Sequence, residues 1–316
     1  MTQHMAGKRA VVTGSSQGIG RAVAMRLAQE GADVVINGTG SVPGMIEEVA
    51  AEIEKLGRRA IPVIGSVADP KVGQRLINTC VKEFGGIDVL MNVAGISGRG
   101  QHILTVTEEV WHDQINVHLH GTFYTCQAAA KQMAEQGYGT IVNTSSHAII
   151  GVFGGTGYGA AKAATNALTY ELAYDLAKHG IRVNCVAPGA QTQMSTGPAF
   201  EAGIQDLIDR GIMKKEEAPL SGNPKKSKAT PERVAALYAW LASDMSAPVT
   251  GRVFSGSGGE IGWFPNFVDT PLAAVDFEGD ETWALEQIQE KLQAIPEIVS
   301  PLPNAYRGDY STVKER

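Results

Sequence analysis

The chain has 316 residues, of which 43% are hydrophobic and 19% charged, with a formal net charge of -6. This composition predicts a globular protein with enough apolar material for a core. The acidic balance argues against nucleic acid or an anionic membrane as a partner, because both attract concentrated basic surface. No uncharged apolar run approaches the ~18 residues of a membrane span, and the three cysteines are widely spaced. We therefore expect a soluble cytoplasmic protein with free thiols.

Short apolar runs alternate with helix-length segments along most of the chain. The runs lack polar alternation, which predicts strands covered by helices on both faces. Right-handed crossovers then give an α/β, Rossmann-type doubly wound parallel sheet, with its ligand crevice beyond the carboxyl ends of the strands. The seven predicted strands are Arg9–Thr13, Asp33–Asn37, Ala60–Gly65, Ile87–Asn92, Thr140–Thr144, Ile181–Ala187 and Arg252–Ser255.

Two segments stand apart from this pattern, so we expect one domain over residues 1–262 with additions. Residues 191–230 are rich in Gly, Pro, Lys and Glu and predict a substrate loop or lid, followed by a helix capped by Thr230. Residues 263–316 predict a partly helical C-terminal extension. Its apolar side chains should pack on the active-site entrance or on a partner subunit. These are Trp263, Phe264, Phe267 and a helical stripe of Leu285, Ile288, Leu292 and Ile295.

A glycine-rich loop follows the first predicted strand, with glycines at positions 14, 18 and 20. Such a loop lets a pyrophosphate approach the amino end of a helix, where amide groups and the helix dipole hold it. About 20 residues further on, dinucleotide sites usually place an acidic residue for the ribose or a basic one for a 2′-phosphate. Residues 37–41 carry neither charge. We therefore expect binding of NADP or NAD, with NADP marginally favoured because nothing repels its phosphate.

A tyrosine and a lysine, Tyr158 and Lys162, are spaced four residues apart at the start of a predicted helix. This spacing places the phenol and the ammonium on one helical face. A nearby cation favours phenolate, so Lys162 is expected to lower the pKa of Tyr158 from its reference of about 10 toward the range of general acid/base work.

Several motifs occur in the order typical of the short-chain dehydrogenase/reductase family, which the sequence resembles from about Gly7 to Gly262. The motifs that carry the resemblance are Thr13-Gly14-x-x-x-Gly18-Ile19-Gly20, Asn92-Val93-Ala94-Gly95, Asn116, Ser145-Ser146, Tyr158-x-x-x-Lys162 and Pro188-Gly189.

The resemblance implies a catalytic set of four residues. Tyr158 would exchange the proton, and Lys162 would lower its pKa and bind the nicotinamide ribose. Ser146 would stabilise developing charge on the substrate oxygen. Asn116 would hold a water that links Lys162 to solvent. Ser145 stays open as the alternative serine, because the usual gap to the tyrosine selects it, whereas strand geometry selects Ser146.

The resemblance also implies a cofactor-binding set. Two positions depart from the family pattern: Val93 replaces an asparagine that ties strands together, and Ser66 stands where an aspartate commonly contacts adenine. The implied cofactor-binding residues are Gly14, Ser16, Gln17, Gly18, Ile19, Gly20, Gly38, Thr39, Ser66, Val67, Asn92, Ala94, Gly95, Tyr158, Lys162, Pro188, Gly189 and Thr192.

These residues predict an NAD(P)-dependent alcohol dehydrogenase or carbonyl reductase acting on a mostly apolar secondary alcohol or ketone. One alternative is a 3-hydroxyacyl thioester dehydrogenase, because short stretches of the sequence are similar to the dehydrogenase domain of multifunctional β-oxidation enzymes. Others are a dinucleotide-sensing binding protein without catalysis, and a non-redox dehydratase or epimerase. The expected pocket residues are Ile96, Ile149, Ile150, Phe153 and Met194.

Partners beyond a small-molecule substrate are expected to be copies of the same chain, since the resemblance implies a homotetramer or homodimer. A metal site is not expected: His112, His118 and His120 share one predicted helix but lack carboxylate or cysteine partners in ligand register.

Overall fold

We describe the protein from a computed structural model that covers residues 3–97, 101–151, 154–196, 198–209, 215, 218, 229–265 and 285–293. The chain divides into two compact units, Met1–Phe264 and Pro265–Arg316. The first unit contains the sheet and every predicted site residue. Trp263 and Phe264, which the sequence analysis assigned to the extension, belong to the first unit because they complete a strand.

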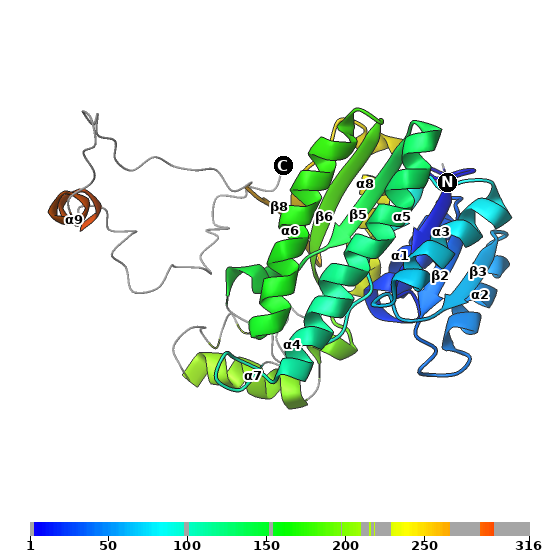
Figure 1. Ribbon diagram of the computed structural model, residues 1–316. Coiled ribbons are helices and arrows are strands. Elements are labelled where there is room, and N and C mark those ends of the chain that lie inside the picture. The colour runs from blue at the N-terminus through cyan, green and yellow to red at the C-terminus, as the bar shows by residue number, and fades with distance from the viewer. Residues whose placement is uncertain are drawn as a thin grey trace, which may run out of the picture. The chain divides into compact units, whose positions relative to one another are not determined.

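One sheet of eight strands runs through the first unit in the order β3-β2-β1-β4-β5-β6-β7-β8 (Figure 1). Neighbouring strands from β3 to β7 are parallel, and β8 is antiparallel to β7. The Rossmann-type doubly wound fold is confirmed, with one strand more than expected. The strands are β1 Arg9–Val12, β2 Asp33–Gly38, β3 Ala60–Ile64, β4 Val89–Met91, β5 Gly139–Thr144, β6 Ile181–Gly189, β7 Val253–Ser257 and β8 Glu260–Phe264.

Helices cover both faces of the sheet and bury two apolar clusters against it. On one face α1, α2 and α8 pack on the side chains of Val12, Val142 and Val186. On the other face α3, α5 and α6 pack on Val11, Ile141 and Val183. The helices are α1 Gly18–Gln29, α2 Met45–Lys55, α3 Pro70–Phe84, α4 Glu108–Gln114, η1 Ile115–His120, α5 Gly121–Gln136, η2 His147–Ile150, α6 Thr156–Ala177, η3 Gln193–Ser195, α7 Pro198–Asp209, α8 Pro231–Ala242 and η5 Asp244–Ser246.

The segment 191–230, expected to be a loop, contains two helical elements, η3 and α7. The glycines and prolines around α7 concealed its short helical pattern. The predicted N-cap at the end of this segment is confirmed, since the side chain of Thr230 accepts a hydrogen bond from the backbone amide of Arg233.

The second unit contributes one described helix, α9 Leu285–Gln293. It includes three of the four stripe residues, Leu285, Ile288 and Leu292, and Leu285 is exposed. Ile295 and Phe267 lie outside the described residues. Among the described residues, no helix combines the length and hydrophobicity that crossing a bilayer requires. The three cysteines are buried free thiols, as expected.

A bidentate ion pair fastens the start of β1 to the start of β4. Arg9 donates from Nε to Asp88 Oδ2 at 2.7 Å and from Nη2 to Asp88 Oδ1 at 3.0 Å. The same carboxylate accepts the backbone amide of Arg9 at 2.7 Å. Both side chains are at most one-fifth exposed, so the pair is shielded from water.

Replacing Asp88 with Ala should lower the free energy of unfolding by about 2 to 3 kcal/mol, because it leaves the shielded Arg9 guanidinium without its partner. Asp244→Ala is the control, since Asp244 pairs with Lys8 but is itself largely exposed, and surface pairs contribute little. Urea unfolding of the two variants measures the difference. Equal losses in both would show that shielding does not strengthen the pair.

Candidate active site

The turn after β1, which contains Gly14, packs closely against the turn after β4, which contains Ala94. We call these two turns together the glycine cradle. Gly14 has a φ of 65°, and a Cβ on it would lie 2.6 Å from the Cα of Ala94. A Cβ on Gly20 would lie 2.1 Å from the carbonyl oxygen of Gly14. Thr13 Oγ1 accepts the backbone amides of Val93 and Ala94, each at 3.0 Å. Only glycine therefore fits at both positions, and the loop stays open for a phosphate at the amino end of α1.

Asn37, which the sequence analysis did not single out, holds this cradle to β2 and β3. Its Oδ1 accepts the backbone amide of Gly14 at 3.2 Å, and its Nδ2 donates to the carbonyls of Val63 and Gly65 at 3.0 Å. The sequence did contain a signal for this role, because Asn37 is a polar residue at the end of an otherwise apolar strand. Beyond Asn37 the end of β2 is uncharged, and Thr39 Oγ1 donates a hydrogen bond of 3.0 Å to Ser41 Oγ.

Four further residues predicted to bind the cofactor are Gly38, Ser16, Thr192 and Ser66. Gly38 lies beside Ser16 of the glycine loop, since a Cβ on Gly38 would be 3.3 Å from the Ser16 Cβ. Thr192 also reaches that loop, because a Cβ on Gly18 would be 3.5 Å from its Cγ2. Ser66 follows β3, and its Oγ accepts the backbone amide of Ala68. Thus Gly38 at the end of β2 and Thr192 after β6 both lie beside the glycine loop at the carboxyl edge of the sheet.

The side chain of Asn92 connects neighbouring elements through hydrogen bonds that the apolar side chain of Val93 cannot make. Its Nδ2 donates to Asn143 Oδ1 of β5 at 3.0 Å, and its Oδ1 accepts the Thr125 hydroxyl of α5 at 2.7 Å. Asn143 in turn donates to the Thr169 hydroxyl of α6 at 3.0 Å. Asn92 therefore provides a hydrogen-bonded connection between strands, although Val93 replaces the asparagine that usually provides one.

The predicted serine, tyrosine and lysine meet at the end of β5. Ser146 follows this strand, and its hydroxyl lies close enough to Tyr158, in the first turn of α6, to lower the pKa of the phenol. The Lys162 Nζ lies 5.7 Å from the Tyr158 ring centroid and donates to the carbonyl of Thr144 at 2.7 Å. Ser145 is buried and donates to the backbone carbonyl of Lys162 at 3.3 Å, away from the phenol. Of the two serines left open by the sequence, Ser146 has the contact with Tyr158.

Burial controls the protonation of this group. It raises the pKa of the Tyr158 phenol, an effect that the neighbouring Ser146 hydroxyl only partly offsets. Burial also lowers the pKa of Lys162 to about 8. The expectation that the pKa of Tyr158 is lowered is not met in the protein alone, because burial disfavours the charged phenolate. Tyr158 is therefore protonated at neutral pH and ready to act as an acid.

The structure does not bring the side chain of Asn116 to this group. It is exposed on η1, and its Oδ1 is paired with His120 Nδ1 at 3.1 Å. The buried His118 lies there instead, with its ring edge-on to Tyr158 at a centroid distance of 4.9 Å and its Nε2 3.0 Å from the Ile96 carbonyl. Burial, and then the charge of Lys162, lower the pKa of His118 well below its usual value. The sequence analysis weighed this histidine only as a metal ligand, and η1 is a π-helical turn that changes which side chains face inward.

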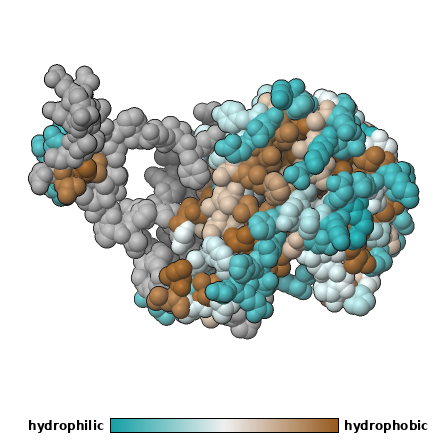
Figure 2. Space-filling view, in the orientation of Figure 1, coloured by the Kyte–Doolittle hydropathy of each residue, from teal (hydrophilic) through white to brown (hydrophobic). Residues whose placement is uncertain are grey.

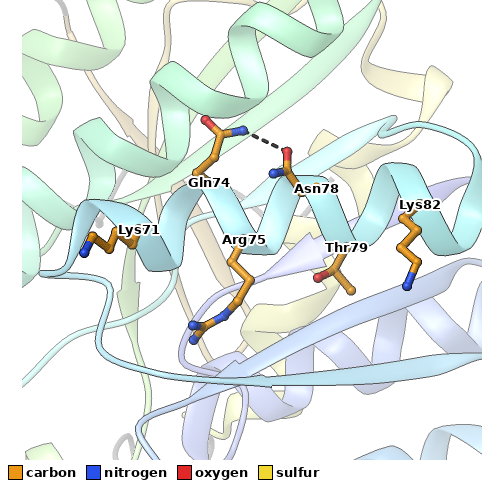
Figure 3. Close-up of a pocket in the computed structure, with 6 residues that line it drawn as sticks. All are labelled: Lys71, Gln74, Arg75, Asn78, Thr79 and Lys82. Carbon is orange, nitrogen blue, oxygen red and sulfur yellow. Dashed lines mark hydrogen bonds between the residues drawn. The ribbon is translucent and has the colours of Figure 1, made fainter.

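A shallow depression lies on the surface of α3 (Figure 3). It is lined by side chains of one helix, and none belongs to the predicted site: Lys71, Gln74, Arg75, Asn78, Thr79 and Lys82. Over the described residues, no cluster of three His, Cys, Asp or Glu side chains could hold a metal ion.

The sequence profile of short chain dehydrogenases matches residues 8–199. The chain belongs to this family. It is 41% identical over 255 residues to L-rhamnose 1-dehydrogenase (NAD(P)(+)) of Sphingomonas sp., an alignment that covers 80% of this chain and 96% of that protein. It is 36% identical to the 3-oxoacyl-[acyl-carrier-protein] reductase FabG of Staphylococcus aureus, over 80% of this chain and 97% of the reductase.

Among solved structures, a short chain dehydrogenase from Mycobacterium avium superimposes with a TM-score of 0.75 at 31% identity, covering 95% of this chain and 98% of its own. The family and these relatives identify the short chain dehydrogenase described here as an NAD(P)-dependent oxidoreductase. The glycine cradle fits that cofactor, since it leaves room for a pyrophosphate at the amino end of α1, and the uncharged end of β2 repels neither NAD nor NADP.

Gly14→Ala should abolish measurable cofactor binding, because the new methyl group would meet the backbone of Ala94. Gly57→Ala is the matched control: Gly57 also has a positive φ, of 77°, but a Cβ there would meet nothing within 4 Å. Both substitutions carry the same backbone strain of about 1 kcal/mol. Fluorescence titration with NADH and NADPH separates them, and equal weakening in both variants would mean that the contact with Ala94 does not shape the cofactor site.

Proposed function

We propose that this dehydrogenase interconverts a mostly apolar secondary alcohol and its ketone, with Tyr158 as the acid/base. The observation that carries the proposal is the position of Tyr158 beside the buried Lys162, whose Nζ lies 5.7 Å from the Tyr158 ring centroid, with Ser146 near the phenol. Tyr158 is a half-buried residue at the carboxyl edge of the sheet, where a substrate beside the cofactor would meet it.

The proton chemistry follows from the three side chains. When bound, NAD(P)H supplies the hydride to the carbonyl carbon. Tyr158 donates its proton to the carbonyl oxygen, and Ser146 donates a hydrogen bond that stabilises the developing charge. Lys162 compensates the phenolate that remains and, as the family resemblance implies, holds the nicotinamide ribose. His118 takes the inward position that the sequence analysis gave to Asn116, and its ring limits the orientations of Tyr158.

The apolar character of the substrate is inferred from the side chains near this group. Ile96, Ile149 and Ile150 are partly exposed and Met194 is exposed, whereas Phe153 lies outside the described residues. None of these side chains carries a charge. An alcohol or ketone with an apolar body suits such surroundings better than a polyhydroxylated or ionised one.

A 3-hydroxyacyl or 3-oxoacyl thioester is the second candidate substrate. It is supported by the likeness to a 3-oxoacyl-[acyl-carrier-protein] reductase, at 36% identity over most of both chains. The acyl portion of such a substrate is also an apolar secondary alcohol or ketone, so the same Tyr158 chemistry serves both candidates.

We further propose that residues 1–262 bind the cofactor and catalyse the reaction, that 191–230 form a substrate lid, and that the protein assembles as a homotetramer or homodimer in the cytoplasm. Hydrophobic side chains gather around α5 and α6 on the face shown in Figure 2. Phe123 of α5 and Tyr174 of α6 are exposed. An apolar face of this kind supports contact with a second copy. Buried free thiols support a reducing compartment.

Tyr158→Phe should lower turnover of the preferred ketone by about 10²- to 10⁴-fold and leave cofactor affinity intact, because it removes only the hydroxyl that transfers the proton. Tyr174→Phe, an exposed position on the same helix, should behave as the wild type. Absorbance of the nicotinamide with a panel of ketones, alcohols and acyl thioesters measures turnover. Near-normal activity in Tyr158→Phe would remove the tyrosine from the mechanism, and cofactor binding without any turnover would favour a sensing protein.

A further inference from the structure

The hairpin of β7 and β8 reaches the active site at two places. At the end of β7, Ser257 lies against Gly189, because a Cβ on Gly189 would be 2.8 Å from the Ser257 Oγ. At the end of β8, the Phe264 ring lies 5.6 Å from the ring of His147, tilted by 64°. His147 directly follows Ser146. The hairpin therefore contacts the turn that the family resemblance places under the nicotinamide and the segment that carries the serine.

The register of the strands explains why Phe264 meets His147. Cys185 of β6 pairs with Val253 of β7, and Val253 pairs with Phe264. Residues opposite each other in a sheet point to the same face. The Cys185 thiol lies 3.7 Å from the Asn166 side chain of α6, so this row faces α6. His147 belongs to the turn that leads into the same helix.

The second aromatic residue of β8 has a different environment. Trp263 pairs with Phe254, whose ring packs on Trp240 of α8 at a centroid distance of 5.9 Å. This row lies on the face opposite to Phe264, because successive residues of a strand alternate between faces. The Trp263 side chain is 57% exposed. Phe264 is thus directed toward the segment that carries Ser146, and Trp263 is directed away from it. Trp263 can therefore serve as a control for substitutions of Phe264.

The His147 turn also touches the turn of Tyr158. A Cβ on Gly154 would lie 2.6 Å from the Tyr158 ring and 3.0 Å from the Ala148 Cβ, and a Cβ on Gly159 would lie 3.2 Å from the Ala148 carbonyl. Ser146 caps this turn by accepting the amide of Ala148 at 3.1 Å. Phe264, His147 and the catalytic hydroxyls are therefore parts of one packed region.

We propose that Phe264 and His147 form one wall of the substrate site beside Ser146, and that Phe264 limits the size of the apolar substituent that the site accepts. This inference rests on the proposed function, since it concerns the substrate of the same Tyr158. It assigns substrate selection to a strand beyond residues 8–199, the part that matches the family profile. Catalytic residues and substrate size are then set by different segments of the chain.

Methyl ketones of increasing alkyl chain length test this wall. Phe264→Ala should raise the ratio of kcat/KM for long over short ketones by about tenfold or more, the discrimination typical of added methylenes in an apolar pocket. Phe264→Leu, which keeps the strand apolar, should give a smaller shift. Trp263→Ala is the control and should leave the ratio unchanged. An unchanged ratio in Phe264→Ala, or the same shift in Trp263→Ala, overturns the proposal.

A second measurement does not depend on turnover. Diethyl pyrocarbonate modifies accessible imidazoles, and peptide mass spectrometry of the full chain gives the rate at His147. We expect faster modification in Phe264→Ala than in the wild type or Trp263→Ala. Equal rates of modification in all three proteins would contradict the proposal that Phe264 covers His147. If the wild type turns over no ketone, the proposed function fails, and the rates at His147 still decide whether Phe264 covers this residue.

Discussion

Lys162 lies almost fully buried, and its ammonium donates a hydrogen bond of 2.7 Å to the backbone carbonyl of Thr144 at the end of β5. A cation in such a position loses much of its hydration, which is why its pKa falls to about 8. The hydrogen bond to Thr144 offsets part of the cost of burying the ammonium. It also holds the ammonium beside Tyr158. The proposed active site depends on this buried amine, which can lose its proton near physiological pH.

The surrounding structure holds that arrangement in place. Asn92, Asn143 and Thr169 connect β4, β5 and α6 through buried side-chain hydrogen bonds. Buried networks of this kind fix one geometry because an unpaired polar group in a dry interior is costly. His118 adds the edge of its ring to Tyr158. The carboxyl end of β5 therefore presents Ser146, Tyr158 and Lys162 as a preorganised group next to the cofactor cradle.

Much of this could be predicted from the sequence, since apolar runs and glycine turns follow local rules. The seven parallel strands, the glycine cradle and the contact between Ser146 and Tyr158 depend on spacing along the chain. What could not be predicted depends on tertiary context. The inward position of His118 results from a π-helical turn, the raised pKa of Tyr158 from burial, and β8 from pairing of a largely exposed edge strand. Helix α7 was concealed because glycines and prolines surround it.

The central claim is that Tyr158 and Lys162 share the titrating proton. A pair that has lost one proton exists as phenol with amine or as phenolate with ammonium, and the second form is the base that alcohol oxidation needs. The most direct test is the pH profile of kcat/KM for alcohol oxidation in the wild type and in Lys162→Met. The account predicts a rise through about pH 8 in the wild type, following the pKa of Lys162, and a rise displaced above pH 10 in the variant, where Tyr158 titrates alone. A rise that stays near pH 8 without Lys162 would contradict it.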